Sequence, residues 1–305
     1  MAEDFRPGFL GVHDYLSLPR DASTWLLNPL IPLSGAGLIY SPAKTGKSAI
    51  ALQLGHAIAG GADDWMGFPI GKHGRVLFLQ VDTPRSTWAL RLQAFERHGY
   101  TFNDDLMKIA DRETLAHFPF DILQPTHAAY LTAIIRQHMP VVAVIIDTLR
   151  KIHTGNENDS TAMSNVMSSL IKACHPAAVI IISHDRKPSL DVEKDIMADH
   201  RGSTSVVGEM DGIMRLTKSR LYYAGRNIEE GNIKILRKDV GDTLIWMPDP
   251  DEHKDAIASV LADTAIPSMR RKARALAPLI SKSEEACMSI LRRQGLRLVD
   301  KIELI

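Results

Sequence analysis

Runs of consecutive apolar residues recur along the first part of the chain. They lie within residues 37–40, 74–82, 140–147 and 178–184. In a strand exposed on one face, apolar and polar residues alternate, whereas a strand buried on both faces is apolar throughout. The four runs therefore predict buried parallel strands.

Between these runs, apolar residues return at helical spacing. The expected helices cover residues 49–59, 86–98, 126–138 and 162–173. In the second of these, Trp88, Leu92 and Phe95 share one face. A further short strand is expected near residues 106–109. Alternation of strands and helices predicts an α/β fold around a mostly parallel sheet.

Beyond residue 210 the pattern changes. Short β-segments are expected at residues 212–216, 221–224, 232–236 and 244–246. Apolar and polar residues alternate along 232–237, which suits antiparallel strands at one edge of the sheet. Two prolines within residues 247–251 then indicate a linker.

The expected organisation has three parts. They are an N-terminal arm (1–30), a large α/β domain (31–247), and a linker with a small C-terminal module (248–305). The arm is rich in proline and aromatic residues, and the sequence leaves open whether it packs on its own domain or on a neighbouring subunit.

Composition restricts the class of protein. The 305 residues carry no net charge and are 45% hydrophobic, which suits one large domain with a small module. No apolar run is long enough to cross a bilayer, and the N-terminus lacks the form of a signal peptide. Cys174 and Cys287 are too few for a disulfide framework or a zinc site. We expect a cytoplasmic protein with no membrane partner.

A phosphate-binding loop follows the first buried strand. Its residues, with the start of the next helix, are Ser41, Pro42, Ala43, Lys44, Thr45, Gly46, Lys47, Ser48 and Ala49. Backbone N–H groups at a helix N-terminus bind phosphate, Lys47 supplies a positive charge, and the Ser48 hydroxyl suits Mg²⁺. Serine at position 41 replaces the first glycine of the usual pattern, so a polar loop without nucleotide remains the alternative.

An acid ends the clearest strand of the chain. Six consecutive apolar residues precede Asp147, as in a Walker B strand. Ligands of open α/β sheets bind at the carboxyl ends of the strands, so Asp147 is expected to join Ser48 in holding Mg²⁺. The alternative is an N-cap for the following helix.

Taken together, the chain resembles RecA-type P-loop ATPases, and within them the plasmid RepA-type hexameric helicases and their phage relatives. The resemblance covers roughly residues 24–247 and rests on an ordered set of motifs. Beyond the P-loop these are residues 75–82, 147–153, 157–158, 183–184 and 201–203. It implies a RecA-like core that binds ATP and Mg²⁺.

The resemblance also implies catalytic roles. Asp82 matches the carboxylate that activates water, which is usually glutamate in this family and is here one methylene shorter. A turn residue before Pro84 is the alternative for Asp82. His184 matches the position that senses the γ-phosphate, and a solvent-exposed histidine at a strand end is its alternative.

Such rings complete each site with a cation from the neighbouring subunit. Arg237 and Lys238 are the first candidates, although the Lys-x-Arg pair of related ATPases is absent at that place. Arg215, Lys218 and Arg220 compete with them, and ordinary surface charge explains any one of these residues equally well.

Two loops correspond to those that line the central channel and contact single-stranded DNA in this fold. They are residues 153–160 and 185–200. In and beside the second loop, Arg186, Lys187 and Arg201 are the expected DNA contacts, but acidic residues are interspersed, so DNA binding here follows from the resemblance and not from charge.

The C-terminal module is different in character. Helices are expected at residues 255–262, 267–279 and 281–293, as in a small winged-helix or helix-turn-helix fold. Residues 267–297 contain eight basic and two acidic side chains, which suits phosphate contact by residues such as Lys282, Arg292 and Arg293. A solvated helical bundle or a subunit-docking tail is the alternative.

The sequence thus predicts a ring-forming ATPase that acts on single-stranded DNA, a helicase of the plasmid or phage replication type. Its expected partners are further copies of itself in a hexamer, together with replication or recombination proteins. A regulatory or recombination-loading ATPase that does not unwind DNA is the second hypothesis. A protein that binds ATP without hydrolysing it is the third.

Overall fold

A computed structural model of the chain describes residues 10–17, 24–115, 119–184, 204–226, 228–249, 257, 260–262, 268–280, 284, 287–288 and 290–291. Its helices and strands, in chain order, are α1 (Val12–Ser17), β1 (Trp25–Leu27), β2 (Ile31–Pro32), β3 (Ala36–Ser41), α2 (Lys47–His56), η1 (Ala57–Gly61), β4 (Asp64–Trp65), β5 (Phe68–Pro69), β6 (Arg75–Gln80), α3 (Arg85–Arg97), β7 (Met107–Asp111), α4 (Pro125–Gln137), β8 (Val141–Asp147), η2 (Leu149–Lys151), α5 (Ser160–Cys174), β9 (Ala178–His184), α7 (Thr204–Gly208), β10 (Gly212–Leu216), β11 (Arg220–Gly225), β12 (Ile228–Asp239), β13 (Leu244–Pro248) and α9 (Met269–Ile280).

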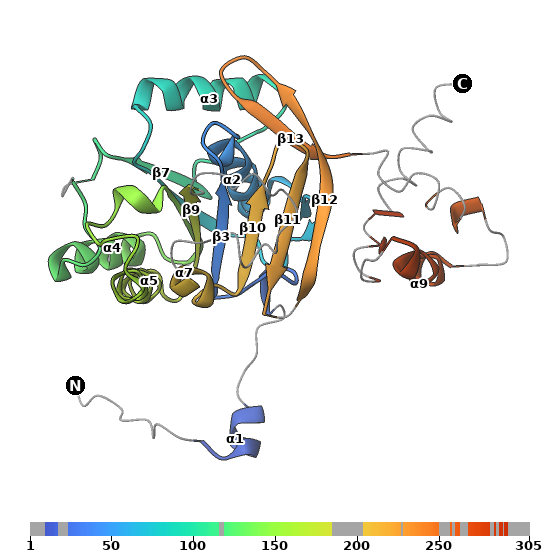
Figure 1. The fold of residues 1–305 in the computed structure, drawn as a ribbon, viewed down its shortest axis with the longest axis horizontal. Helices are drawn as coiled ribbons and strands as arrows, with labels where there is room; N and C mark the ends of the chain where they lie inside the picture. Colours follow the sequence, from blue (N-terminus) through green and yellow to red (C-terminus); the bar gives the residue numbers. More distant parts are fainter. Residues whose placement is uncertain are drawn as a thin grey trace.

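A nine-stranded sheet organises the α/β domain (Figure 1). The strand order is β13-β12-β11-β10-β3-β9-β8-β6-β7. Every neighbouring pair from β10 to β7 is parallel, whereas β10 to β13 pair antiparallel with one another. This arrangement confirms the predicted RecA-like core, a mostly parallel sheet with antiparallel edge strands.

Helices cover both faces of the parallel strands. Ala143 and Ile145 of β8 pack in the cluster that contains α2 and α3, whereas Val144 and Ile146 pack in the cluster that contains α4, α5 and α7. Successive side chains of a strand point to opposite faces, so a strand covered on both sides must be apolar at every position. The continuous apolar runs of the sequence follow from this double burial.

The segment before the first parallel strand packs on the domain. Leu26 and Leu27 are fully buried in the same cluster as α2. β1 pairs with β2. Residues 65–70 contribute to a small hairpin of β4 and β5, which the sequence pattern did not predict, and Leu27 forms an isolated bridge to Ile70.

The described C-terminal residues form their own hydrophobic cluster. Ala273, Leu276 and Ile280 lie on one face of α9 and are buried with Ile257 and Leu291. An apolar stripe on a basic helix is the pattern expected of a small helical module. Its assignment as a helix-turn-helix fold stays a prediction.

Candidate nucleotide-binding site

The carboxyl ends of four parallel strands meet around one cleft. Strand pairing places Ser41 beside His184, and Gln80 beside Asp147. A cleft of about 500 Å³ opens above them. It is lined by residues 43, 44 and 46–49 of the loop and helix, by residues 241–244 of the β12–β13 hairpin, and by Asp82, Thr83, Arg91, Asp147 and His184.

The loop between β3 and α2 turns sharply at Gly46. Gly46 has φ +100°, in the left-handed region that favours glycine, and a Cβ there would lie 2.9 Å from the Leu244 side chain. Helix α2 begins at the next residue, so its N-terminal turn borders the cleft. Such a helix end binds anions.

Ser41, which departs from the usual glycine, has a defined role in this loop. It is fully buried, and its hydroxyl accepts a hydrogen bond from Lys47 Nζ at 3.2 Å and donates to Pro42 O at 2.9 Å. Lys47 Nζ also donates to Ser41 O at 3.0 Å and Pro42 O at 3.1 Å. The serine therefore helps to orient the lysine, which is 6% exposed.

Asp147 has a buried carboxylate oxygen that is suited to bind a cation. The residue is 4% exposed, and its Oδ2 has no hydrogen-bond partner among the described residues. Burial raises the pKa of Asp147 to about 6, while a hydrogen bond from Ser48 opposes the shift. A buried carboxylate beside a serine hydroxyl is a donor set that fits Mg²⁺. No cluster of three or more His, Cys, Asp or Glu ligands occurs in the described part of the chain.

Asp82 lies two residues beyond the end of β6. Its carboxylate is partly exposed, lines the cleft and is 3.8 Å from Lys151 Nζ of η2. The backbone on either side is fixed, because Val81 N donates to Asp147 O at 2.9 Å and Asp82 N donates to Gln80 Oε1 at 3.0 Å. Asp82 thus borders the same space as Lys47 and Asp147.

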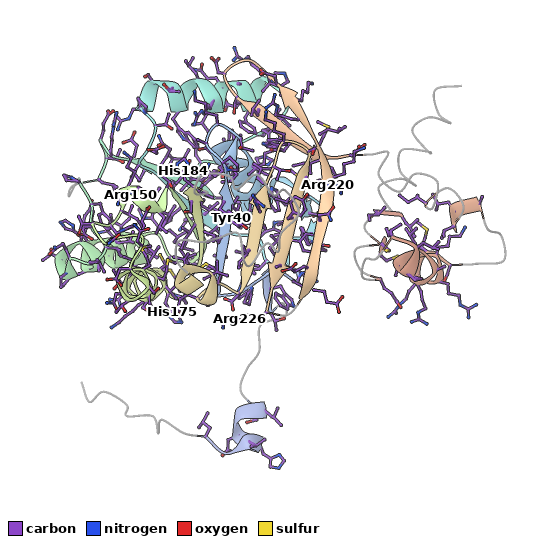
Figure 2. All side chains as sticks on the ribbon, viewed as in Figure 1. Tyr40, Arg150, His175, His184, Arg220 and Arg226 are labelled. Atoms are coloured by element: carbon purple, nitrogen blue, oxygen red, sulfur yellow. The ribbon has the colours of Figure 1, made fainter. Side chains whose placement is uncertain are left out.

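His184 is the last residue of β9, and Figure 2 labels it near the carboxyl ends of the strands. Burial, and then the nearby Lys47 ammonium, lower the pKa of its imidazole. A histidine whose pKa falls below its usual value near 6.5 is neutral at pH 7. One ring nitrogen then remains a donor and the other an acceptor.

Arg91 is a cleft residue that the sequence pattern did not single out. It lies on α3, half-buried over the Trp88 ring, with its guanidinium carbon 5.7 Å from the ring centroid. Its Nη1 is 3.4 Å from Thr83 Oγ1, and its charge lowers the pKa of Asp147. Its place in the cleft depends on how α3 packs on the sheet, which the local sequence pattern does not show.

The candidate trans-acting residues lie outside this cleft. Arg237 and Lys238 are exposed on β12, where they pair with Trp246 and Ile245 of β13. Among the competing residues, Arg215 is half-buried, Lys218 is exposed, and Arg220 donates to Asn232.

The expected DNA-contacting residues are not placed by the structure. Arg186, Lys187, Arg201, Lys282, Arg292 and Arg293 all lie outside the described residues. The first expected channel loop is described, and it is anchored: Thr154 Oγ1 donates to Asp121 Oδ2 at 2.6 Å. Within it, His153 is buried and its pKa is lowered by that burial.

The chain is similar to many solved structures, and two of them are described here. A DnaB-like replicative helicase, described with its interactions with primase, has 14% identity and a TM-score of 0.49. The match covers 70% of this chain and 57% of the helicase chain. A KaiC-like protein from Pyrococcus horikoshii OT3 has 12% identity and a TM-score of 0.45. The match covers 75% of this chain and 99% of the KaiC-like chain.

No curated protein matches the chain at a significant level. Within the described residues, no helix has the length and apolar character needed to cross a membrane. The family model for the AAA domain AAA_25 matches residues 2–189, more than half of the chain, and includes the P-loop, Asp82, Asp147 and His184. The RecA-type P-loop sheet and this match lead to one conclusion: the chain belongs to the AAA_25 family of AAA domains.

Proposed function

We propose that the protein is a ring-forming ATPase acting on DNA, a RepA-type replicative helicase that couples ATP hydrolysis to translocation on single-stranded DNA. The observation that supports this most is the meeting of Lys47, Ser48, Asp82, Asp147 and His184 around one cleft. These residues come from four different strand ends, and their chemical types suit phosphoryl transfer.

Each side chain has a role that fits its surroundings. Lys47 holds the β- and γ-phosphates, and Ser48 with Asp147 would hold Mg²⁺, which neutralises charge on the phosphate oxygens when bound. Asp82 accepts a proton from the attacking water. His184, neutral because its pKa is lowered, donates a hydrogen bond to a phosphate oxygen.

A neighbouring subunit would complete the site. The exposed side chains of Arg237 and Lys238 lie on the antiparallel edge and not in the cleft of their own chain. Residues placed in this way are suited to reach the cleft of the next subunit in a ring and to stabilise charge on the phosphoryl group. A hexameric ring is therefore part of the proposal.

The path from the nucleotide to DNA would start at η2. Lys151 of η2 approaches Asp82, and η2 leads directly into the loop of residues 153–160. A change at the γ-phosphate can reach this loop through Asp82 and Lys151. Single-stranded DNA is the proposed ligand of the loop, with replication or recombination proteins as further partners.

A regulatory or recombination-loading ATPase is the second candidate. The shorter carboxylate of Asp82 and its approach to Lys151, at 3.8 Å, favour slow hydrolysis. In this case ATP would control binding of DNA or of a partner protein, without strand separation.

Phosphate release with and without single-stranded DNA tests the proposal, with Lys47→Ala as the blank. Strong stimulation by DNA, together with separation of a forked duplex, is the result expected of a helicase. The second candidate is supported if DNA stimulates phosphate release, or if the protein retains DNA only with ATP, and the duplex is not separated in either case. Slow release that DNA does not change rejects the motor, and Asp82→Glu then tests whether the short carboxylate limits the rate.

A further inference from the structure

We propose that Gln80 is a positioning residue that fixes the carboxylate of Asp82 for the attack of water. The inference rests on the proposed function, because it assigns Asp82 as the group that accepts the proton. Gln80 contacts no substrate and acts through the backbone of the turn that carries Asp82.

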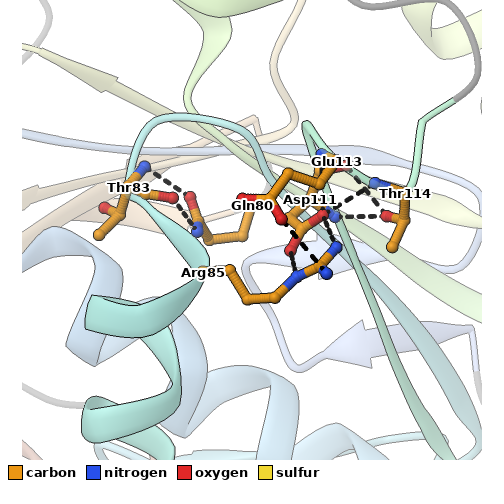
Figure 3. A network of polar contacts seen from close by, with 6 residues as sticks. All are labelled: Gln80, Thr83, Arg85, Asp111, Glu113 and Thr114. Carbon is orange, nitrogen blue, oxygen red and sulfur yellow. Dashed lines mark hydrogen bonds and ion pairs between the residues drawn. The ribbon is translucent and has the colours of Figure 1, made fainter.

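The side chain of Gln80 is fully buried, and all its described hydrogen bonds go to this turn. Its Oε1 accepts from Asp82 N at 3.0 Å and from Thr83 N at 2.7 Å. Its Nε2 donates to Thr83 O at 2.6 Å. Figure 3 shows the Gln80 amide facing Thr83 at the end of the strand. One amide thus holds two consecutive residues by three hydrogen bonds.

A second contact fixes the far end of the same turn. Arg85 begins α3 and donates to both carboxylate oxygens of Asp111, at 2.6 and 2.8 Å, and its Nη1 is 3.3 Å from Glu113 (Figure 3). The Arg85 guanidinium holds the pKa of Asp111 well below its usual range. Asp111 also accepts from Thr114 N at 2.9 Å, so this acceptor is itself held in place.

The contacts leave little freedom between these two points. Val81 N donates to Asp147 O, so the residue before Asp82 is tied to the strand that carries the candidate magnesium ligand. Residues 82 and 83 are tied to Gln80, and residue 85 to Asp111. The Cα of Asp82 is therefore fixed relative to Asp147.

A fixed backbone matters more for aspartate than for glutamate. Aspartate has one fewer rotatable bond, so its carboxylate follows its backbone and cannot be re-aimed by a third torsion angle. A displacement of about 1 Å in a catalytic group can lower a rate about a hundredfold. We infer that the Gln80 amide compensates for the short side chain of Asp82.

The simpler alternative is that the Gln80 side chain only provides hydrogen-bond partners for the backbone after β6 and has no effect on catalysis. Gln80→Met separates the two, because methionine has a similar length and makes none of the three hydrogen bonds. The expected result is a fall of about tenfold to a hundredfold in kcat with the KM for ATP nearly unchanged. Gln80→Glu keeps the acceptor for both N–H groups and should lose less.

A double-mutant cycle provides the decisive measurement. In an Asp82→Asn background, Gln80→Met should lower the residual single-turnover rate no further, because a positioning residue acts only through the group it positions. Gln53→Met removes a different buried amide and serves as the matched control, whose effect should be independent of Asp82. Thermal unfolding and nucleotide binding of each variant check that the fold is retained.

The outcomes are distinct. If Gln80→Met lowers kcat equally with and without Asp82, or weakens ATP binding instead of kcat, the role of Gln80 is overturned while the proposed function stands. If the unmodified protein releases no phosphate, or Asp82→Asn leaves release unchanged, the proposed role of Asp82 fails and that of Gln80 with it. If Gln80→Met does not fold, Gln80→Leu takes its place in the same cycle, because leucine also makes none of the three hydrogen bonds, and a kcat that changes equally with and without Asp82 rejects the role.

Discussion

The parallel and antiparallel halves of the sheet differ in what they offer to the site. β3, β6, β8 and β9 are buried on both faces, and their carboxyl ends supply Lys47, Asp82, Asp147 and His184 or the loops that carry them. β12 alternates buried and exposed residues over positions 232–236, and its last four residues, which include Arg237 and Lys238, are all exposed. The first half holds its groups in place, whereas the second presents exposed side chains near one edge of the sheet.

The two halves are joined at the phosphate-binding loop. Gln53 of α2 accepts from Trp246 N and donates to Trp246 O, both at 2.9 Å, and also contacts Tyr100. Leu244 and Trp246 pack against Gly46. The hairpin of β12 and β13 therefore packs on the helix that begins at Lys47. A movement of the hairpin would displace the start of this helix.

Lys47→Ala should have the largest effect, and it tests the parallel half of the sheet. It removes the lysine of the loop whose ammonium group makes three hydrogen bonds, so we expect hydrolysis to fall by about 10² to 10³-fold and ATP affinity to fall with it. Phosphate release and binding of a fluorescent ATP analogue measure both. Lys44→Ala, in the same loop but exposed, should lose much less. Equal losses would show that only net charge matters.

Arg237→Ala should test the antiparallel half of the sheet. If the residue acts on a neighbouring site, hydrolysis should fall by about a hundredfold or more while ATP binding by the same chain is retained. Mixing Arg237→Ala with Lys47→Ala subunits should restore part of the activity, because some interfaces then combine an intact loop with an intact arginine.

Arg226→Ala is the control for this experiment. Arg226 is an exposed arginine that directly follows β11, and it contacts Gly208 and Asp211. No recovery on mixing, or an equal loss in the control, would contradict a trans-acting role for Arg237. Lys238→Ala and Lys218→Ala then become the next variants to compare.

Gln53→Met should loosen the joint between the halves. It leaves the buried N–H and C=O of Trp246 without their partner, which costs about 1–3 kcal/mol in the free energy of unfolding. Denaturant unfolding measures the loss, and faster hydrogen exchange confined to residues 244–248 would locate it. Exchange that rises evenly over β3 and β8 would show instead that the hairpin is not a separate unit.

Leu236→Ser should have the smallest effect. Leu236 is 42% exposed on β12, so its replacement should change the free energy of unfolding by less than about 0.5 kcal/mol. Ile235→Ala, one residue earlier and 2% exposed, should cost about 2–5 kcal/mol. A large loss from Leu236→Ser in the assembled protein, absent at low concentration, would place this face in a subunit contact.

Most of the parallel half could be predicted because its signals are local. A strand buried on both faces needs an unbroken apolar run, and the loop after it needs glycine, lysine and serine in one order. The hairpin of β4 and β5 was missed, since each strand has only two residues and is held by contacts with distant segments. Arg91 was missed for a related reason, because its contact depends on the packing of α3.

The sequence by itself determined the buried parallel strands, the phosphate-binding loop and the acids at or just beyond the strand ends, because burial and loop conformation impose residue types at short spacing. The tertiary structure decided which of these meet. It placed β13 over the loop, made Ser41 a partner of Lys47, and turned Gln80 toward the backbone of Asp82. These contacts join residues through strand order and helix packing, and the local pattern of apolar and polar positions does not encode which strands become neighbours.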